Sequence, residues 1–199
     1  MSTIVVTKLN GEVCIGADSL TCFGSLRLSA DNNHSASKII KVGDTFLGLP
    51  GTAANSYVFQ SYFDDPSRPR DFSSDERIFE TLRAAHRVLR EDYFMLPHGD
   101  KDDSYELTQI YGLGANPHGI FGFFTHRSVI MYKHFWAAGS GRDYALGAMQ
   151  AGLSKARSAR ELAKMGLETA AYFDDGSSAP FDIHTIKLKK DKRGSRARR

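Results

Sequence analysis

The sequence has few cysteines and no long apolar run, and each shortage excludes a class of protein. It contains two cysteines among 199 residues, which are too few for a small disulfide-stapled fold or a four-cysteine zinc site. No segment approaches the roughly 18 apolar residues of a membrane-spanning helix. The first residues lack the basic and long apolar regions of a signal peptide. We therefore expect a protein of the reducing cytoplasm with no membrane partner.

Positive charge is concentrated at one end of the chain. Lys and Arg number 26 against 23 Asp and Glu, and eight of the basic residues fall within 187–199. The remainder is acidic overall. No linker or internal repeat divides it, so we interpret 1–188 as one domain and 189–199 as a solvated basic tail. Such a tail could instead bind an acidic partner, but we do not expect nucleic-acid binding, because the aromatic residues within 121–136 fit a sheet core.

Hydrophobic periodicity predicts blocks of strands separated by pairs of helices. The predicted strands are 2–9, 12–17, 38–42, 45–49, 106–114, 119–125, 129–138 and 181–188. The predicted helices run from Gly51 to about Pro66, from Ser73 to Tyr93, over 142–153 and over 158–173, with capping boxes at Ser73 and Ser158. Polar loops are expected over 25–37 and 97–104. Because strands and helices do not alternate singly, we expect an α+β protein in which two stacked antiparallel sheets carry helices outside.

The second residue could supply a nucleophile. Ser2 is small enough for methionine aminopeptidase to remove Met1, which would leave a free α-amine on Ser2. An α-amine has a reference pKa near 8, and it can act as the general base for the hydroxyl of its own residue. A serine at position two is common, so this pattern alone does not indicate an enzyme.

Four other segments would complete such a site. The Asn-Gly hairpin turn that follows the first strand brings Asp18 back toward Ser2. Lys38 opens the next strand, where its charge would lower the pKa of the hydroxyl and the amine while Asp18 holds it. Gly51, at the predicted start of the first helix, offers a backbone amide to an oxyanion. The Gly-Ser-Gly turn at 139–141 is a second place where the backbone can approach closely, and it adds the hydroxyl of Ser140.

Taken in order, these motifs resemble those of the proteasome β subunits and HslV-type N-terminal-nucleophile hydrolases. Within that family they resemble a small bacterial group, the betaproteobacterial proteasome homologues. The opening Ser-Thr-Ile-Val-Val-Thr-Lys-Leu-Asn-Gly is similar to the family's Thr-Thr start and its basic-Asn/Asp-Gly turn. Further similar segments are Ser37-Lys38-Ile39, Leu49-Pro50-Gly51-Thr52-Ala53-Ala54 and Gly139-Ser140-Gly141-Arg142-Asp143-Tyr144-Ala145.

The resemblance implies a four-layer αββα sandwich that hydrolyses amide bonds without a metal or cofactor. It implies stacked homo-oligomeric rings acting on a peptide or unfolded protein, and it leaves open an ATPase unfoldase as partner. The implied catalytic residues are Ser2, Asp18, Lys38, Gly51, Ser140, Asp174 and Ser177. The implied substrate-binding residues are Leu49, Ala53 and Cys22.

Two of these assignments have alternatives. The interval between Asp18 and Lys38 is longer than in the family, so Lys41 is a second candidate for the catalytic lysine. A register shifted by one residue, with Asp175 and Ser178, fits the last motif almost as well.

Two other functions also fit the sequence. Serine lacks the methyl group that stiffens χ1 of threonine, so Ser2 would be oriented less tightly and a ring-forming scaffold with weak or lost catalysis is one alternative. A hydrolase of small amides with the same fold is another. Such an enzyme usually needs insertions that cover its substrate, for which 199 residues leave little room.

Overall fold

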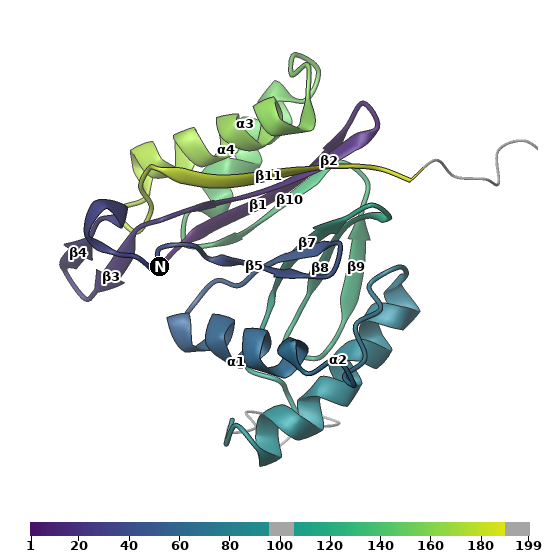
Figure 1. Ribbon diagram of the computed structural model, residues 1–199. Coiled ribbons are helices and arrows are strands. Elements are labelled where there is room, and N and C mark those ends of the chain that lie inside the picture. Colours follow the sequence, from purple (N-terminus) through teal and green to yellow (C-terminus); the bar gives the residue numbers. More distant parts are fainter. Residues whose placement is uncertain (96–105, 190–199) are drawn as a thin grey trace, which may run out of the picture.

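The computed structural model describes residues 1–95 and 106–189, and these form four layers. Two antiparallel sheets lie face to face, and a pair of helices covers the outer face of each sheet (Figure 1). The predicted αββα sandwich is therefore confirmed. The predicted loop at 97–104 and residues 190–199 of the basic tail lie outside the described residues.

The first sheet joins the two ends of the chain to a strand from its middle. Its strands, in order, are β10 (Phe135–Gly139), β1 (Thr3–Leu9), β2 (Glu12–Asp18) and β11 (Phe181–Lys187). Asn10 and Gly11 both have positive φ, of 52° and 80°, as a tight hairpin turn requires. The resulting register pairs Ile4 with Ala17, so Asp18 lies beside the start of β1.

The second sheet comes from the middle of the sequence. Its strands, in order, are β5 (Ile39–Val42), β6 (Thr45–Gly48), β7 (Gly112–Asn116), β8 (Gly119–Phe123) and β9 (Val129–Tyr132). The prediction of one strand over 129–138 was wrong. The strand is interrupted at 133–134, and the chain continues as β10 in the other sheet. The strand predicted over 106–114 begins only at Gly112.

A short hairpin that the periodicity missed precedes the second sheet. Its strands are β3 (Thr21–Phe23) and β4 (Leu26–Leu28), followed by the 3₁₀ helix η1 (Ala30–Asn32), where the sequence predicted a polar loop from residue 25. Each strand has three residues, too few to show a period of two. Phe23 and Leu26 are exposed at the hairpin tip, so no buried face distinguishes it from a loop.

The four helices lie close to the predicted ranges. They are α1 (Ala53–Asp64), α2 (Asp75–Glu91), α3 (Arg142–Gly152) and α4 (Ala159–Phe173). Ser158 caps α4 as predicted. The cap predicted at Ser73 was wrong, because the hydroxyl of Ser73 bonds to Asp71 at 2.6 Å while Ser74 accepts the amide of Arg77.

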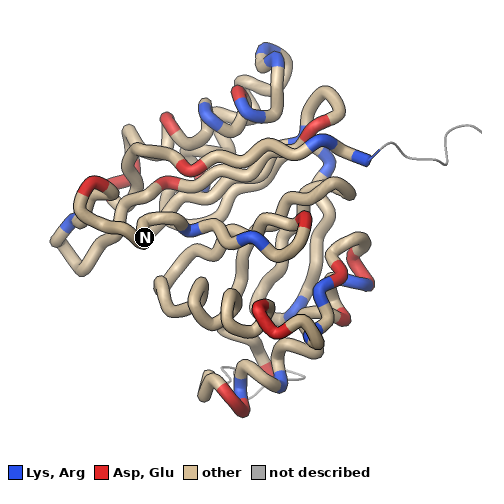
Figure 2. Tube along the Cα trace, in the orientation of Figure 1, with Lys and Arg blue, Asp and Glu red and all other residues tan. Residues whose placement is uncertain are grey.

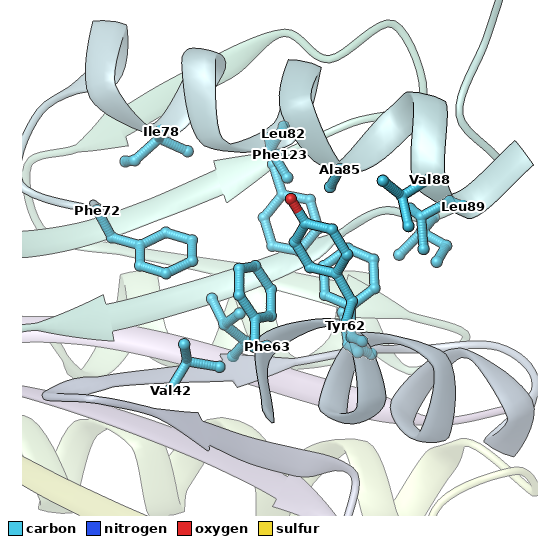
Figure 3. Close-up of a cluster of buried hydrophobic side chains, with 14 of the residues drawn as sticks. Val42, Tyr62, Phe63, Phe72, Ile78, Leu82, Ala85, Val88, Leu89 and Phe123 are labelled. Carbon is cyan, nitrogen blue, oxygen red and sulfur yellow. The ribbon is translucent and has the colours of Figure 1, made fainter. Parts of the chain in front are cut away.

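The core has three layers that follow from the alternation of side chains along the strands. Ile4 and Val6 of β1 point toward the second sheet, whereas Val5 points toward α3 and α4. An aromatic cluster that includes Tyr62 and Phe63 fills the space between α1, α2 and the second sheet (Figure 3).

Charged residues lie mainly on helices and turns (Figure 2). Among the described residues, no helix has the length and apolar character to cross a membrane.

Candidate active site

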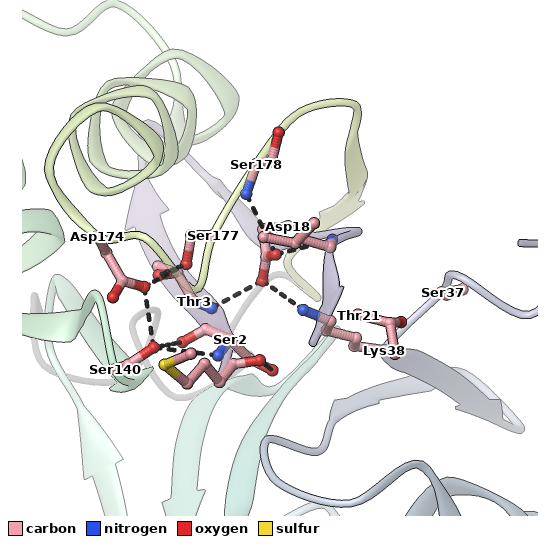
Figure 4. A network of polar contacts seen from close by, with 12 residues as sticks. Ser2, Thr3, Asp18, Thr21, Ser37, Lys38, Ser140, Asp174, Ser177 and Ser178 are labelled. Carbon is pink, nitrogen blue, oxygen red and sulfur yellow. Dashed lines mark hydrogen bonds and ion pairs between the residues drawn. The ribbon is translucent and has the colours of Figure 1, made fainter. Parts of the chain in front are cut away.

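The predicted site residues converge at one end of the first sheet, beside the N-terminus. Ser2 precedes β1, Asp18 ends β2, Lys38 precedes β5 and Ser140 follows β10. Figure 4 shows these side chains around Ser2, with Asp174 and Ser177 from the loop after α4.

A buried carboxylate organises one half of this site. Asp18 is 1% exposed. Its Oδ1 accepts hydrogen bonds from Nζ of Lys38 at 2.7 Å and from the backbone N–H of Thr3 at 2.8 Å. Its Oδ2 accepts the backbone N–H of Leu20 at 3.0 Å and of Ser178 at 3.4 Å. These bonds satisfy a charge that could not otherwise be buried, and they fix the ammonium group of Lys38 at the base of the site.

The structure places Lys38, and not Lys41, against Asp18. Lys41 lies on β5 with its Nζ 5.5 Å from the centre of the Phe46 ring. The interval between Asp18 and Lys38 contains the β3–β4 hairpin and η1, which project from the sheets, so the two charged groups still meet.

A second carboxylate organises the other half. Asp174 Oδ2 accepts hydrogen bonds from Ser140 Oγ at 2.8 Å and from Ser177 Oγ at 2.6 Å. Ser140 Oγ in turn accepts the backbone N–H of Ser2 at 3.2 Å. Of the two alignments of the last motif, the one with Asp174 and Ser177 therefore brings its residues to Ser140. Ser178 instead donates its backbone N–H to Asp18.

Two glycines of the site have a positive φ, and one of them also lies at a close approach of two backbone segments. Gly139 has φ +97°, and a Cβ there would overlap the carbonyl group of Ser2. Gly51 has φ +106°. It lies two residues before α1, which begins at Ala53 and not at Gly51 as predicted. This positive φ turns the chain into the helix beside the same cavity that Ser2 lines.

Met1, where it is present, covers the predicted nucleophile. Ser2 is 3% exposed, and its hydroxyl donates to the carbonyl oxygen of Met1 at 2.5 Å. The side chain of Met1 packs against Gly176. While the Met1–Ser2 peptide bond is intact, the nitrogen of Ser2 is an amide without basic character, so a base forms here only after Met1 is removed.

A cavity of about 580 Å³ opens above Ser2. All three predicted substrate-binding residues line it, together with Ser2 and Lys38. Sequence reasoning missed Ser56, Tyr57 and Gln60, which also line the cavity. With Ala53 they follow the i, i+3, i+4, i+7 spacing of one helix face, and this signal could have identified them. Among the described lining residues, Lys38 is the one charged side chain and no Asp or Glu occurs.

The two cysteines are expected to differ in reactivity, which gives a direct test of the cavity. Cys14 is fully buried, and burial raises the pKa of its thiol to about 11, whereas Cys22 lines the cavity. Because the thiolate is the reactive form, iodoacetamide should modify Cys22 and spare Cys14 in the native protein. Peptide mapping of the alkylated chain measures this. Modification of Cys14 before unfolding would contradict the arrangement.

The chain is similar along nearly its whole length to solved proteasome-like structures. Thiobacillus denitrificans BPH has 35% sequence identity and a TM-score of 0.87, and the match covers 95% of this chain and 100% of BPH. The structure of the same protein in complex with epoxomicin gives 34% identity, a TM-score of 0.87 and coverages of 94% and 99%. HslV from Trypanosoma brucei, with 17% identity, a TM-score of 0.65 and coverages of 93% and 99%, shares the fold. Neither a scan against protein-family models nor a search of curated proteins finds a match.

Proposed function

The chain belongs to the family of proteasome β subunits and HslV-type N-terminal-nucleophile hydrolases, and we propose that it is a cytoplasmic, self-compartmentalising peptidase subunit with Ser2 as nucleophile. The observation that carries this proposal is that Ser2 lies against Ser140 and lines one cavity together with Lys38, which is paired with Asp18. Removal of Met1 converts the buried amide of Ser2 into a free amine beside its own hydroxyl, which is the pairing that an N-terminal nucleophile needs.

Acylation begins when the Ser2 amine takes the proton of the Ser2 hydroxyl. The oxygen then forms a bond to the carbonyl carbon of the peptide, and the carbonyl oxygen becomes an oxyanion. Gly51 donates its backbone N–H to this oxyanion. One such donor contributes about 3 kcal/mol to stabilisation of the transition state.

The tetrahedral intermediate collapses as the carbon–nitrogen bond of the peptide breaks. The protonated Ser2 amine gives its proton to the leaving nitrogen, so the amine is again a base. It next takes a proton from water, whose oxygen attacks the ester carbon. The carbon–oxygen bond to Ser2 breaks, the proton returns to the Ser2 oxygen, and the acid product leaves.

The charged pair supports the step in which Ser2 loses its proton. The ammonium group of Lys38 lies 2.7 Å from Asp18 and lines the cavity with Ser2. A fixed positive charge favours the developing negative charge on the Ser2 oxygen. Asp18 holds Lys38 in place, and four hydrogen bonds hold the carboxylate of Asp18 itself.

The cavity lining favours an apolar side chain before the scissile bond. Leu20 and Leu49 are each 3% exposed and line the cavity with Ala53. A substrate lysine would bury its ammonium group without a carboxylate partner and near Lys38, which is unfavourable. A peptide with norleucine at this position should be hydrolysed at least about tenfold faster than the same peptide with lysine, which has the same four side-chain carbons and adds an ammonium group. Equal kcat/KM for the two fluorogenic peptides would contradict this specificity.

Hydrolysis and assembly can be tested on one preparation. The Met1-free chain should cleave an apolar fluorogenic peptide and should elute as a ring in size-exclusion chromatography with light scattering. Because BPH has been solved in complex with epoxomicin, epoxomicin should inhibit the cleavage. A ring without hydrolysis or inhibition would favour the scaffold alternative, and an active monomer would contradict compartmentalisation.

A further inference from the structure

Thr3 contacts both carboxylate networks of the site, and the mechanism above assigns it no role. Its backbone N–H donates to Oδ1 of Asp18 at 2.8 Å. Its hydroxyl Oγ1 lies 2.7 Å from Oγ of Ser177. The residue is fully buried. We propose that Thr3 is a positioning residue that holds Asp174 and Ser140 in the arrangement that the Ser2 amine requires, an inference that rests on the proposed peptidase function.

The hydrogen-bond directions follow from counting hydroxyl protons. A carboxylate only accepts hydrogen bonds, so Ser177 must use its single proton to donate to Asp174 at 2.6 Å. Ser177 has no proton left for Thr3, so the Thr3 hydroxyl is the donor in the bond of 2.7 Å. The hydroxyl protons of Thr3 and Ser177 therefore point in the same direction along this series of hydrogen bonds, which ends at Asp174.

The same counting of hydroxyl protons determines the direction of the hydrogen bonds of Ser140. Its single proton has two acceptors, the carboxylate of Asp174 at 2.8 Å and the carbonyl oxygen of Ser2 at 3.3 Å. The shorter bond to a charged group is the stronger one. With its proton directed to Asp174, Ser140 accepts from the nitrogen of Ser2. An amine that donates to Ser140 keeps its lone pair for the hydroxyl of Ser2.

Loss of the Thr3 hydroxyl would weaken this arrangement of hydrogen bonds without changing the reacting atoms. Ser177 would lose its donor and could rotate away from Asp174, which would then be held by Ser140 alone. A less firmly held Asp174 competes less well with the Ser2 carbonyl for the Ser140 proton. Hydrogen-bonded networks of this kind act together, so removal of an outer member changes the inner bonds.

The turn before α3 is shaped around the same hydroxyl. A Cβ at Gly141 would overlap Oγ1 of Thr3 and would lie 3.1 Å from Oδ2 of Asp174. The absence of a side chain at position 141 leaves room for the Thr3–Ser177 contact. Figure 4 shows Thr3 beside Ser177 and Asp174, which lie far from it in the sequence.

The test uses three variants of the assembled, Met1-free chain and a peptide epoxyketone as probe. Thr3→Val has nearly the same shape and keeps the backbone bond to Asp18, but it lacks the hydroxyl. We expect it to lower the maximal rate of covalent labelling about tenfold, with an unchanged half-saturating probe concentration. Thr3→Ser restores the donor and should recover most of the rate.

Thr7→Val is the matched control. Thr7 lies on the same strand and the same face, is also fully buried, and donates to the carbonyl oxygen of Ala159 at 2.7 Å. Its loss should lower the melting temperature to a similar extent and leave labelling at the wild-type rate. If Thr3→Val does not fold, Thr3→Ala takes its place, because it removes the hydroxyl without a branched side chain.

The outcomes separate this inference from the proposed function. Labelling of wild type, slow labelling of Thr3→Val and recovery by Thr3→Ser support the inference. Labelling of Thr3→Val at the wild-type rate, or equal slowing by Thr7→Val, overturns it while the peptidase function stands. Absence of labelling in wild type contradicts the peptidase function and with it any role of Thr3 in that reaction.

Discussion

Replacement of Lys38 with methionine is expected to lower the rate of peptide hydrolysis about 10³-fold and to destabilise the fold. Methionine keeps much of the length of the side chain but removes the charge that lies 2.7 Å from Asp18. The side chain of Asp18 has no exposure and that of Lys38 is 13% exposed, so the variant leaves a buried carboxylate without its ion partner. Such a loss costs about 3 kcal/mol in proteins. Hydrolysis of the norleucine peptide and urea unfolding measure the two effects.

Lys41→Met is the control for this prediction. Lys41 lies on the adjoining strand with an exposed side chain over the ring of Phe46, so its replacement should leave hydrolysis and the unfolding midpoint near wild-type values. An equal loss of activity in the two variants would show that the lysine has been assigned incorrectly.

Replacement of Ser2 with alanine is expected to abolish hydrolysis, with a loss of at least about 10⁴-fold in kcat, because no other group takes the role of a removed nucleophile at comparable rate. The fold should be nearly unaffected. Within the described residues, the hydroxyl of Ser2 donates to the adjacent carbonyl of Met1, and alanine keeps the backbone bond to Ser140. Steady-state kinetics and thermal unfolding of the same preparation measure both quantities.

Ser35→Ala tests whether any serine of the cavity would give the same result. Ser35 also lines the cavity but is exposed, and its backbone N–H donates to Oδ1 of Asn33. It should retain full activity. Residual hydrolysis by Ser2→Ala would place the nucleophile elsewhere, and the thiol of Cys22, which lines the same cavity, would be the first group to replace.

The sequence predicted the layers of the fold because the strands that form them have clear periodicity and turns. Asn10-Gly11 fixed the register of β1 and β2, and through that register the approach of Asp18 to Ser2. Where periodicity was short or ambiguous, the prediction was wrong. The segment 129–138 was predicted as a single strand, but it crosses from one sheet to the other at Lys133 and His134, the polar pair that separates its two apolar stretches.

The site was accessible from the sequence only in part. Ser2, Asp18, Lys38 and Ser140 lie in recognisable motifs, and the structure brings them together. The choice between Lys38 and Lys41 depended on how the segment between Asp18 and Lys38 folds, which no local pattern determines. Thr3 was missed for a different reason: its hydroxyl meets Ser177 across 174 positions of sequence, and a buried threonine in a strand otherwise needs no functional explanation.

The central claim is that Ser2 reacts through a hydroxyl activated by its own freed amine. The most direct test is intact mass spectrometry of the purified chain before and after reaction with a peptide epoxyketone, in which the hydroxyl adds to the ketone and the amine opens the epoxide. We predict a chain that lacks Met1 and gains one molecule of inhibitor, with both new bonds mapped to Ser2. A chain that retains Met1 and gains no inhibitor would contradict the claim.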